Sequence, residues 1–185
     1  MLCTGMPIPD EAPPVIAAGH SYGGSVLTEA ADGAPNVRAL VYIASFNLDV
    51  GESTGELAGK FPGARLGDAL APVPFPGGTD LYIQTEQFNA IFAADVEPDV
   101  AALMAATQRP IAANALEDRA TKAAWRSIPS WTMVTLQDLA IPADSMRFMA
   151  ERAGSTTVEI DASHAVTVSE PVAVAELIDA AARAV

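Results

Sequence analysis

Residues 15–24 have the sequence VIAAGHSYGG, which carries the clearest indication of the fold class. The apolar run over residues 15–18 ends at a glycine and is typical of a buried strand of a parallel sheet. Residues 22–31 have a helical pattern that ends at Asp32-Gly33, a common C-terminal signal of a helix. A second buried strand, VRALVYIA, follows at residues 37–44. Strand, helix and strand in this order predict a βαβ unit of a parallel sheet.

The turn between the first strand and the helix carries a G-x-S-x-G motif over residues 19–23. In this context the motif predicts a nucleophile elbow, in which Ser21 stands on a sharp, strained turn. Gly19 and Gly23 lack Cβ atoms, so we expect strand and helix to approach closely there. The backbone N–H of Tyr22 is then a natural oxyanion donor. The alternative is a glycine-rich turn without chemistry.

A serine hydroxyl needs a base, and the chain has two histidines. His164 follows the last predicted strand, so it lies at the sheet edge where Ser21 must also lie, and we predict that it is the base. His20 adjoins the serine, and we expect it only to pack and to form hydrogen bonds at the turn.

The group that orients the base is predicted to be Asp138, which follows the strand at residues 130–135. This gives the chain order serine, aspartate, histidine that is expected for such a fold. Asp49 and Asp161 are rivals, and Asp49 is the more plausible substitute of the two.

The remaining chain extends the strand and helix alternation. We predict strands at residues 130–135 and 156–160, and helices at 142–153 and 171–184. Residues 1–14 are predicted to be an irregular lead-in. The predicted core comprises residues 1–45 and 129–185, and the predicted cap insertion comprises residues 46–128. Within this insertion, residues 51–80 are rich in Gly and Pro, and helices are predicted at residues 86–94, 98–107 and 112–124.

The insertion is expected to cover the serine with an apolar pocket. Its candidate lining residues are Phe46, Phe88, Phe92, Met104 and Trp125. The alternative is that each is an ordinary core residue of the cap. A direct binding role for Arg109 is weighed as well and not favoured, because surface arginines are common. An apolar cap without a basic cluster favours small uncharged esters over phosphorylated or polyanionic substrates.

Composition bounds the class of protein. The chain has 185 residues, half of them hydrophobic, which fits one domain with a full core. Its net charge of −13 disfavours nucleic acids and anionic membranes as partners. Cys3 is the only cysteine, so neither an internal disulfide nor a thiolate zinc site is expected, which suits a reducing cytoplasm. We find no signal peptide and no apolar stretch of about 20 residues.

Taken together, the elbow with its second glycine (GHSYGG, 19–24), ALVYIA (39–44), IPSW (128–131) leading through Asp138 to Pro142, and DASH (161–164) resemble the α/β-hydrolase superfamily. The likeness is greatest to the esterase branch that also contains plant methylesterases and hydroxynitrile lyases. The resemblance implies Ser21 as nucleophile, His164 as general base and acid, and Asp138 as the orienting acid. It implies an acyl-enzyme mechanism on a small-molecule ester, with no metal or organic cofactor.

This chain also departs from the pattern of the family that it resembles. Family members have several strands and a helix before the elbow, together with a loop that carries a second oxyanion donor. Here the nucleophile is at position 21, so we expect an α/β-hydrolase fold that lacks its N-terminal strands. The parallel sheet would keep about four strands and a helical cap insertion. The strand at residues 15–18 would then lie at an open edge, and we expect residues 1–12, a partner chain or a second copy of the chain to cover it.

Two other functions remain open at this stage. A hydroxynitrile lyase would use the same three residues and usually needs a cation near the serine, but Lys60 and Lys122, the only lysines, lie in no recognisable motif. An inactive binding or interaction module would follow if the oxyanion hole is incomplete.

Overall fold

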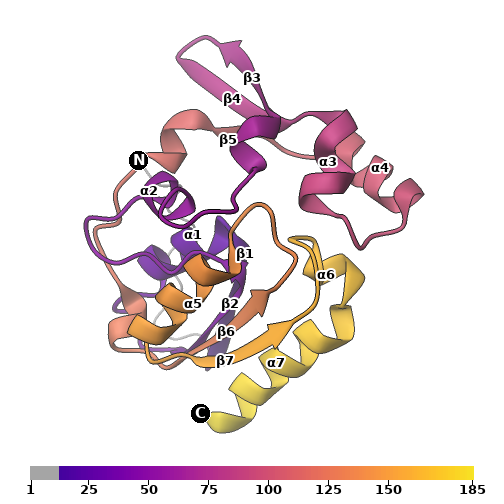
Figure 1. Cartoon of the computed structure of the whole chain (residues 1–185). Coiled ribbons are helices and arrows are strands. Elements are labelled where there is room, and N and C mark those ends of the chain that lie inside the picture. The colour runs from indigo at the N-terminus through magenta and orange to yellow at the C-terminus, as the bar shows by residue number, and fades with distance from the viewer. Residues whose placement is uncertain (1–12) are drawn as a thin grey trace.

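A four-stranded parallel sheet lies at the centre of the computed structural model, which describes residues 13–185 (Figure 1). The spatial order is β1-β2-β6-β7, and every neighbouring pair is parallel. The strands are β1 (Val15–Ser21), β2 (Val37–Ser45), β6 (Ser130–Thr135) and β7 (Thr156–Ile160). The predicted α/β class with about four parallel strands is confirmed. Cys3 and most of the predicted lead-in lie outside the described residues.

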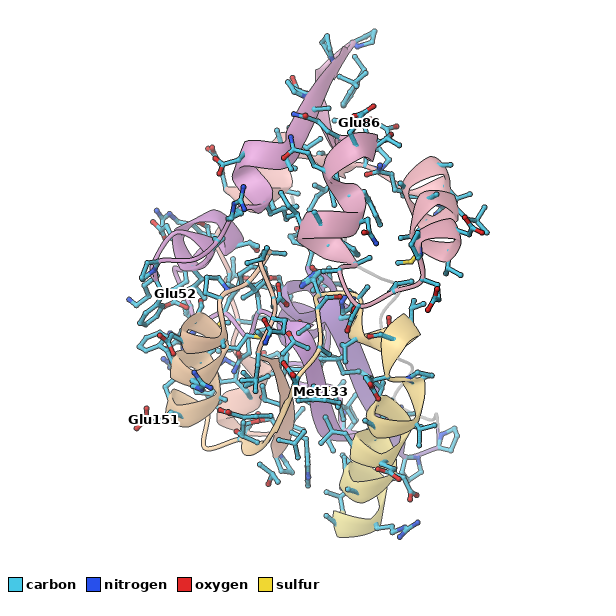
Figure 2. All side chains as sticks on the ribbon, turned by 45° about the vertical axis from the view of Figure 1, so that its right-hand side comes forward. Glu52, Glu86, Met133 and Glu151 are labelled. Carbon is cyan, nitrogen blue, oxygen red and sulfur yellow. The ribbon has the colours of Figure 1, made fainter. Side chains whose placement is uncertain are left out.

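The central strand β2 is buried on both faces, which explains its unbroken apolar sequence. Leu40 and Tyr42 pack with Leu27 of α1 (Gly23–Ala30) in one cluster. Val41 and Ile43 belong to the main core, which also holds residues of α7 (Pro171–Ala184). Because neighbouring strand residues point to opposite faces, α1 and α7 cover opposite sides of the sheet. In Figure 2, Met133 lies inside the molecule, while Glu86 and Glu151 lie on its surface.

The helices of the sheet region follow the predicted ranges closely. The helix expected over residues 22–31 is α1, that over 142–153 is α5 (Ala143–Arg152), and that over 171–184 is α7. Pro171 occupies the first turn of α7, where a missing N–H costs nothing. The short helix α6 (Val166–Ser169) precedes α7 and is not predicted by the sequence pattern.

A second layer of structure lies above the carboxyl ends of the parallel strands (Figure 1). Two of its helices match the predictions for residues 86–94 and 98–107. This layer comprises η1 (Leu66–Ala69), β3 (Leu70–Phe75), β4 (Gly78–Ile83), α3 (Thr85–Phe92), α4 (Pro98–Thr107) and β5 (Ile111–Ala112). The layer lies within the predicted insertion, although Leu57 and Ala120 of the same range pack into the main core.

The β3–β4 hairpin was not predicted, because its prolines indicate irregular chain. β3 is an edge strand of the sheet β3-β4-β5, and no strand lies on its open side. A proline that faces this side lacks an N–H that no neighbouring strand would accept. Phe75 pairs with Gly78, and Gly77 in the connecting turn has a φ of 103°. Only glycine adopts that φ at low cost, and it closes the hairpin.

The helix predicted over residues 112–124 is wrong. The chain there forms two short turns, η2 (Ala113–Leu116) and η3 (Ala124–Arg126), with an extended piece between them. Ala120 exchanges backbone hydrogen bonds of 2.8 Å with Gly51 and Glu52. The carboxylate of Glu29 accepts the backbone N–H groups of Thr121 and Lys122. These tertiary partners satisfy the backbone and override the helix propensity of the segment.

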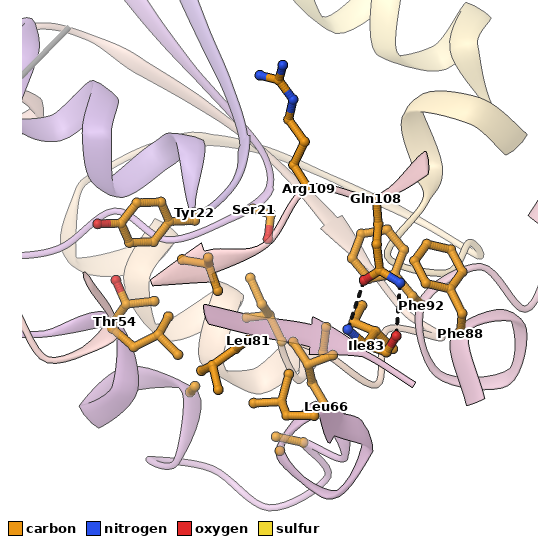
Figure 3. Close-up of a pocket in the computed structure, with 18 of the residues that line it drawn as sticks. Ser21, Tyr22, Thr54, Leu66, Leu81, Ile83, Phe88, Phe92, Gln108 and Arg109 are labelled. Atoms are coloured by element: carbon orange, nitrogen blue, oxygen red, sulfur yellow. Dashed lines mark hydrogen bonds between the residues drawn. The ribbon is translucent and has the colours of Figure 1, made fainter. Parts of the chain in front are cut away.

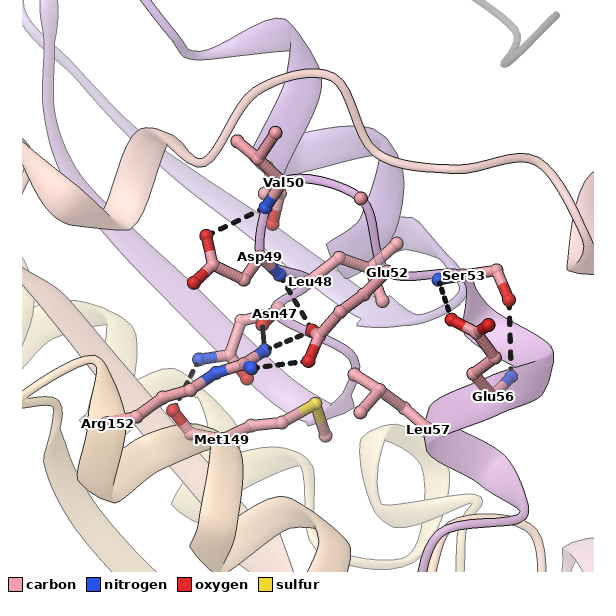
Figure 4. A network of polar contacts seen from close by, with 12 residues as sticks. Asn47, Leu48, Asp49, Val50, Glu52, Ser53, Glu56, Leu57, Met149 and Arg152 are labelled. Atoms are coloured by element: carbon pink, nitrogen blue, oxygen red, sulfur yellow. Dashed lines mark hydrogen bonds and ion pairs between the residues drawn. The ribbon is translucent and has the colours of Figure 1, made fainter.

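A polar network fastens the segment after β2 to α5 (Figure 4). Both carboxylate oxygens of Glu52 lie 2.6 Å from Arg152, and Asn47 donates to the carbonyl of Met149 over 3.0 Å. A capping box between Ser53 and Glu56 starts the short helix α2 (Thr54–Ala58). The network fixes the segment that carries four residues of the cavity described below.

The outer side of β1 has no strand partner among residues 13–185. No helix in this part of the chain is long and apolar enough to span a bilayer.

Candidate active site

Ser21 is the last residue of β1 and has a φ of 54°, a conformation that non-glycine residues rarely adopt. The helix α1 starts two residues later, so the serine occupies a sharp strand-to-helix turn. A Cβ on Gly19 would lie 2.7 Å from the carbonyl oxygen of Gly23, which explains the glycine before the serine. The strained turn predicted from the motif is present.

The crowded glycine on the helix side is Gly24, and the expectation for Gly23 is wrong. A Cβ on Gly23 would meet nothing within 4 Å, whereas one on Gly24 would lie 2.0 Å from the Ser45 hydroxyl. That hydroxyl donates to the carbonyl oxygen of Ser21 over 2.6 Å. The end of β2 therefore holds the turn from behind. Sequence reasoning missed Ser45, whose only signal is its position at the end of a neighbouring strand.

One hydrogen-bonded chain joins Ser21, His164 and Asp138. His164 Nε2 lies 2.8 Å from Ser21 Oγ, and His164 Nδ1 lies 2.7 Å from Asp138 Oδ2. The side chains of His164 and Asp138 are fully buried. With its proton on Nδ1, the imidazole donates to the carboxylate and accepts from the serine hydroxyl. This arrangement allows His164 to remove the serine proton.

The Asp138 carboxylate is held by further donors around it. Oδ1 accepts the backbone N–H groups of Ala140 and Ile141, each over 2.8 Å, and Oδ2 accepts the Thr135 hydroxyl over 2.8 Å. Burial by itself raises the pKa of Asp138, but His164 and these donors outweigh it and hold the pKa below its ordinary value. The group therefore stays ionised beside the imidazole.

The rival carboxylates lie elsewhere. Asp49 pairs with Arg126 over 2.7 Å, and Asp161 accepts the side-chain amide of Gln137 over 2.7 Å. Neither has a hydrogen bond to His164.

His20 packs against His164 rather than toward open solvent. Its Nε2–H donates to the backbone carbonyl of His164 over 2.8 Å, and the two ring centroids are 4.8 Å apart. Burial and the charge of His164 lower the pKa of His20 to about 4, so the ring is neutral at physiological pH. Phe92 meets the His164 ring edge-on at 4.7 Å. The His164 ring is thereby held on two sides by aromatic rings.

Asp95, in the loop between α3 and α4, holds Ser163, the residue before His164. Its carboxylate accepts the backbone N–H of Ser163 over 2.8 Å and the Ser163 hydroxyl as well. Burial opposes ionisation of this carboxylate, yet the hydrogen bonds from Ser163 keep the pKa of Asp95 below its ordinary value. The segment between α3 and α4 therefore contacts the loop that carries His164. Nothing in the sequence near Asp95 signals this role.

A cavity of about 570 Å³ opens next to Ser21 (Figure 3). Phe46, Phe88, Phe92 and Met104 line it, as does Tyr22. The fifth pocket candidate does not lie there. The indole N–H of Trp125 donates to the carbonyl of Leu48 over 2.8 Å, and the ring packs against two arginines. Trp125 belongs to the cluster around α1, because η3 carries it away from the cap layer.

The charged groups of the chain are largely absent from this cavity. Arg109 is its only charged lining residue, and it is exposed. Lys60 lies over the Phe148 ring at 4.7 Å, and Lys122 lies 3.7 Å from Asp32. Across residues 13–185, no group of three His, Cys, Asp or Glu side chains is arranged to hold a metal ion.

Comparison with known proteins gives a family match over most of the chain. The profile of the Alpha/beta hydrolase family matches residues 4–177. The Alpha/beta hydrolase nvfD of Aspergillus novofumigatus (strain IBT 16806) is 28% identical over 182 residues, which cover 91% of this chain and 70% of that protein.

Solved structures with a similar fold include several esterases and related enzymes. Polyneuridine aldehyde esterase superposes with a TM-score of 0.77 at 19% identity, covering 92% of this chain and 72% of its own. A pyrethroid hydrolase gives 0.72 at 23% identity, covering 94% and 72%. Tomato methylketone synthase I, complexed with 2-tridecanone, gives 0.71 at 17% identity, covering 95% and 73%. At these identities the likeness establishes the fold.

Proposed function

Since this chain belongs to the alpha/beta hydrolase family, we propose that it is a serine esterase that cleaves uncharged carboxylic esters of small molecules. Family membership and the esterase-type structural neighbours support a hydrolase. The observation that carries the finer proposal is the continuous hydrogen-bonded chain from Ser21 through His164 to Asp138.

The proposed reaction proceeds through an acyl-enzyme. Ser21 Oγ attacks the ester carbonyl carbon while His164 Nε2 takes the hydroxyl proton, and the carbonyl oxygen becomes an oxyanion. Asp138 keeps the imidazole in the required tautomer and stabilises the imidazolium. The C–O bond to the alcohol then breaks, and the imidazolium protonates the leaving alkoxide. Water, deprotonated by His164, hydrolyses the acyl group and restores the serine.

The backbone N–H of Tyr22 is the proposed oxyanion donor, because it follows the nucleophile at the start of α1. The resemblance to the family also implies a second donor from a loop before the elbow. Since one such donor typically contributes a factor of about 10²–10³ to kcat, the rate reports how complete the oxyanion hole is.

A fluorophosphonate probe tests the proposal. The folded protein should be labelled at Ser21, and Ser21→Ala should not be labelled. Failure to label a folded sample would favour the inactive binding module instead.

The lyase alternative lacks support from the lysines, because both lie against groups outside the cavity. It predicts cyanide release from mandelonitrile by the wild-type protein. Absence of cyanide together with ester hydrolysis would leave the esterase proposal as it stands.

We also propose that the open edge of β1 is covered in the working protein, because unpaired strand edges invite association. Residues 1–12, which lie outside the described residues, a partner chain and a second copy are the candidates. Light scattering coupled to size-exclusion chromatography distinguishes a dimer from a monomer. A cytoplasmic location, suggested by the single cysteine, is checked by cell fractionation.

A further inference from the structure

Resting on the proposed esterase function, we propose that the cavity beside Ser21 takes a bulky, unsubstituted hydrocarbon arm of the ester. The cavity belongs to the same site, so the proposal concerns the substrate class and not a second activity.

The lining is almost wholly apolar and comes from both layers of the fold. The η1 segment and β4 supply Leu66, Leu81 and Ile83 across from the serine, as Figure 3 shows. Phe88 and Phe92 of α3 close one end of the cavity. Apolar walls bind hydrocarbon because each methylene removed from water contributes favourably to binding.

The polar side chains that line the cavity are already bonded within the protein. Gln108 accepts the backbone N–H of Ile83 over 2.8 Å and donates to its carbonyl over 2.9 Å (Figure 3). It also donates to the carbonyl of Ala105 over 2.9 Å, so β4 and α4 together occupy both of its N–H groups. Thr54 shares a hydrogen bond of 3.0 Å with Ser25. Tyr22 Oη donates to the carbonyl of Ala115 over 3.3 Å, and Thr107 donates to the carbonyl of Leu103 over 2.8 Å.

A polar substituent that entered this cavity would therefore lose its water and meet lining hydroxyl and amide groups that already form hydrogen bonds within the protein. Burial of an unpaired hydroxyl or amide typically weakens binding by about tenfold or more. Arg109 is the exception among the lining residues, but its side chain is exposed to water. Its charge does not enter the enclosed part of the cavity.

The volume sets the size of the group. A water molecule takes up about 30 Å³ in the liquid, and a methylene group is of comparable size. The cavity measures about 570 Å³, so a methyl or acetyl group would leave most of it empty. An alkyl chain or ring system of many carbons fills it.

Binding of methyl alkanoates to the Ser21→Ala variant, measured by calorimetry, tests the proposal without any turnover. Affinity should increase roughly fourfold for each methylene from methyl butanoate to methyl octanoate, about 250-fold in all. Methyl 8-hydroxyoctanoate should bind at least about tenfold more weakly than methyl octanoate. A flat series, or tighter binding of the carboxylate-bearing monomethyl suberate through Arg109, would overturn the proposal.

A matched pair of variants ties the effect to the cavity. Leu81→Trp, added to Ser21→Ala, places a bulky indole ring in the cavity and should lower the octanoate-to-butanoate affinity ratio at least about tenfold. Leu103→Trp makes the same exchange on the outer face of α4, where the side chain is 63% exposed, and should leave the ratio unchanged. Equal effects of the two variants would contradict the assignment.

The two proposals can fail separately. Fluorophosphonate labelling of the wild type tests the nucleophile alone. If the wild type is labelled but the binding series is flat, only the proposal of a hydrocarbon arm fails. If the binding series is steep but the wild type is not labelled, only the esterase proposal fails.

Discussion

His20 provides the sharpest physical prediction, because it is a buried histidine that the folded protein keeps neutral. Its pKa lies at about 4 in the folded protein, against 6.5 for an ordinary histidine, through burial first and the charge of His164 second. Between these two pH values the unfolded chain binds a proton that the folded protein does not. The free energy of unfolding therefore decreases as the pH falls from 6.5 toward 4.

The magnitude follows from the linkage relation. Between pH 7 and pH 5, protonation of the unfolded chain alone lowers the free energy of unfolding by about 2 kcal/mol through this one residue. The sequence pI of about 4.3 makes pH 5 a practical lower limit, because proteins associate near zero net charge. His20→Gln removes the titration but keeps a side-chain N–H that can donate to the His164 carbonyl.

Urea unfolding followed by tryptophan fluorescence at pH 7, 6 and 5 measures the effect. The wild type should lose about 2 kcal/mol more than His20→Gln over this range. His20→Phe, which keeps an aromatic ring but no donor, should match the pH dependence of His20→Gln and differ from it only in absolute stability. If the wild type and both variants have the same pH dependence, His20 is not the neutral buried group described here.

Three further predictions concern the site and its supports. Asp138→Asn should lower kcat for a p-nitrophenyl ester by about 10⁴-fold, because the imidazole would lose its orienting carboxylate. A near-normal kcat would show that Asp138 does not orient His164. Gly24→Ala should lower the free energy of unfolding in urea by about 1–3 kcal/mol, since its Cβ would overlap the hydroxyl behind it, whereas Gly23→Ala meets open space and should not destabilise. Glu52→Gln should cost about 1–3 kcal/mol in the same assay, because the side chain of its partner Arg152 is only 19% exposed. Glu56→Gln, whose partner Arg119 is 60% exposed, should cost clearly less, and equal costs of the two variants would contradict the reasoning.

The sequence predicts best those elements whose run of apolar residues follows directly from their burial in the core. β2 has an unbroken apolar run because helices cover both of its faces, and the strand lies within one residue of its predicted range. The strands β6 and β7 match their predicted ranges as well. The hairpin β3–β4 was missed because proline excludes only inner strands, and nothing local says that a strand lies at an edge.

The candidate site likewise contains some residues that the sequence predicts and others that only the structure reveals. The strand, turn and helix around Ser21 predict the nucleophile, and the position of His164 after the last strand predicts the base; the structure places the two side chains 2.8 Å apart. The choice among three aspartates rested on chain order, and the hydrogen bond to His164 Nδ1 distinguishes Asp138 from the other two. Asp95 could not be found, because its partner Ser163 lies 68 residues away along the chain.

The parallel α/β scheme and the strained turn at Ser21 can therefore be predicted from the sequence, because both depend on residues that are neighbours along the chain. Long-range packing sets the extended path of residues 117–123, the crowding at Gly24 and the exclusion of Trp125 from the cavity. Each of these depends on atoms brought together from distant segments, where backbone pairing and close packing outweigh local propensity.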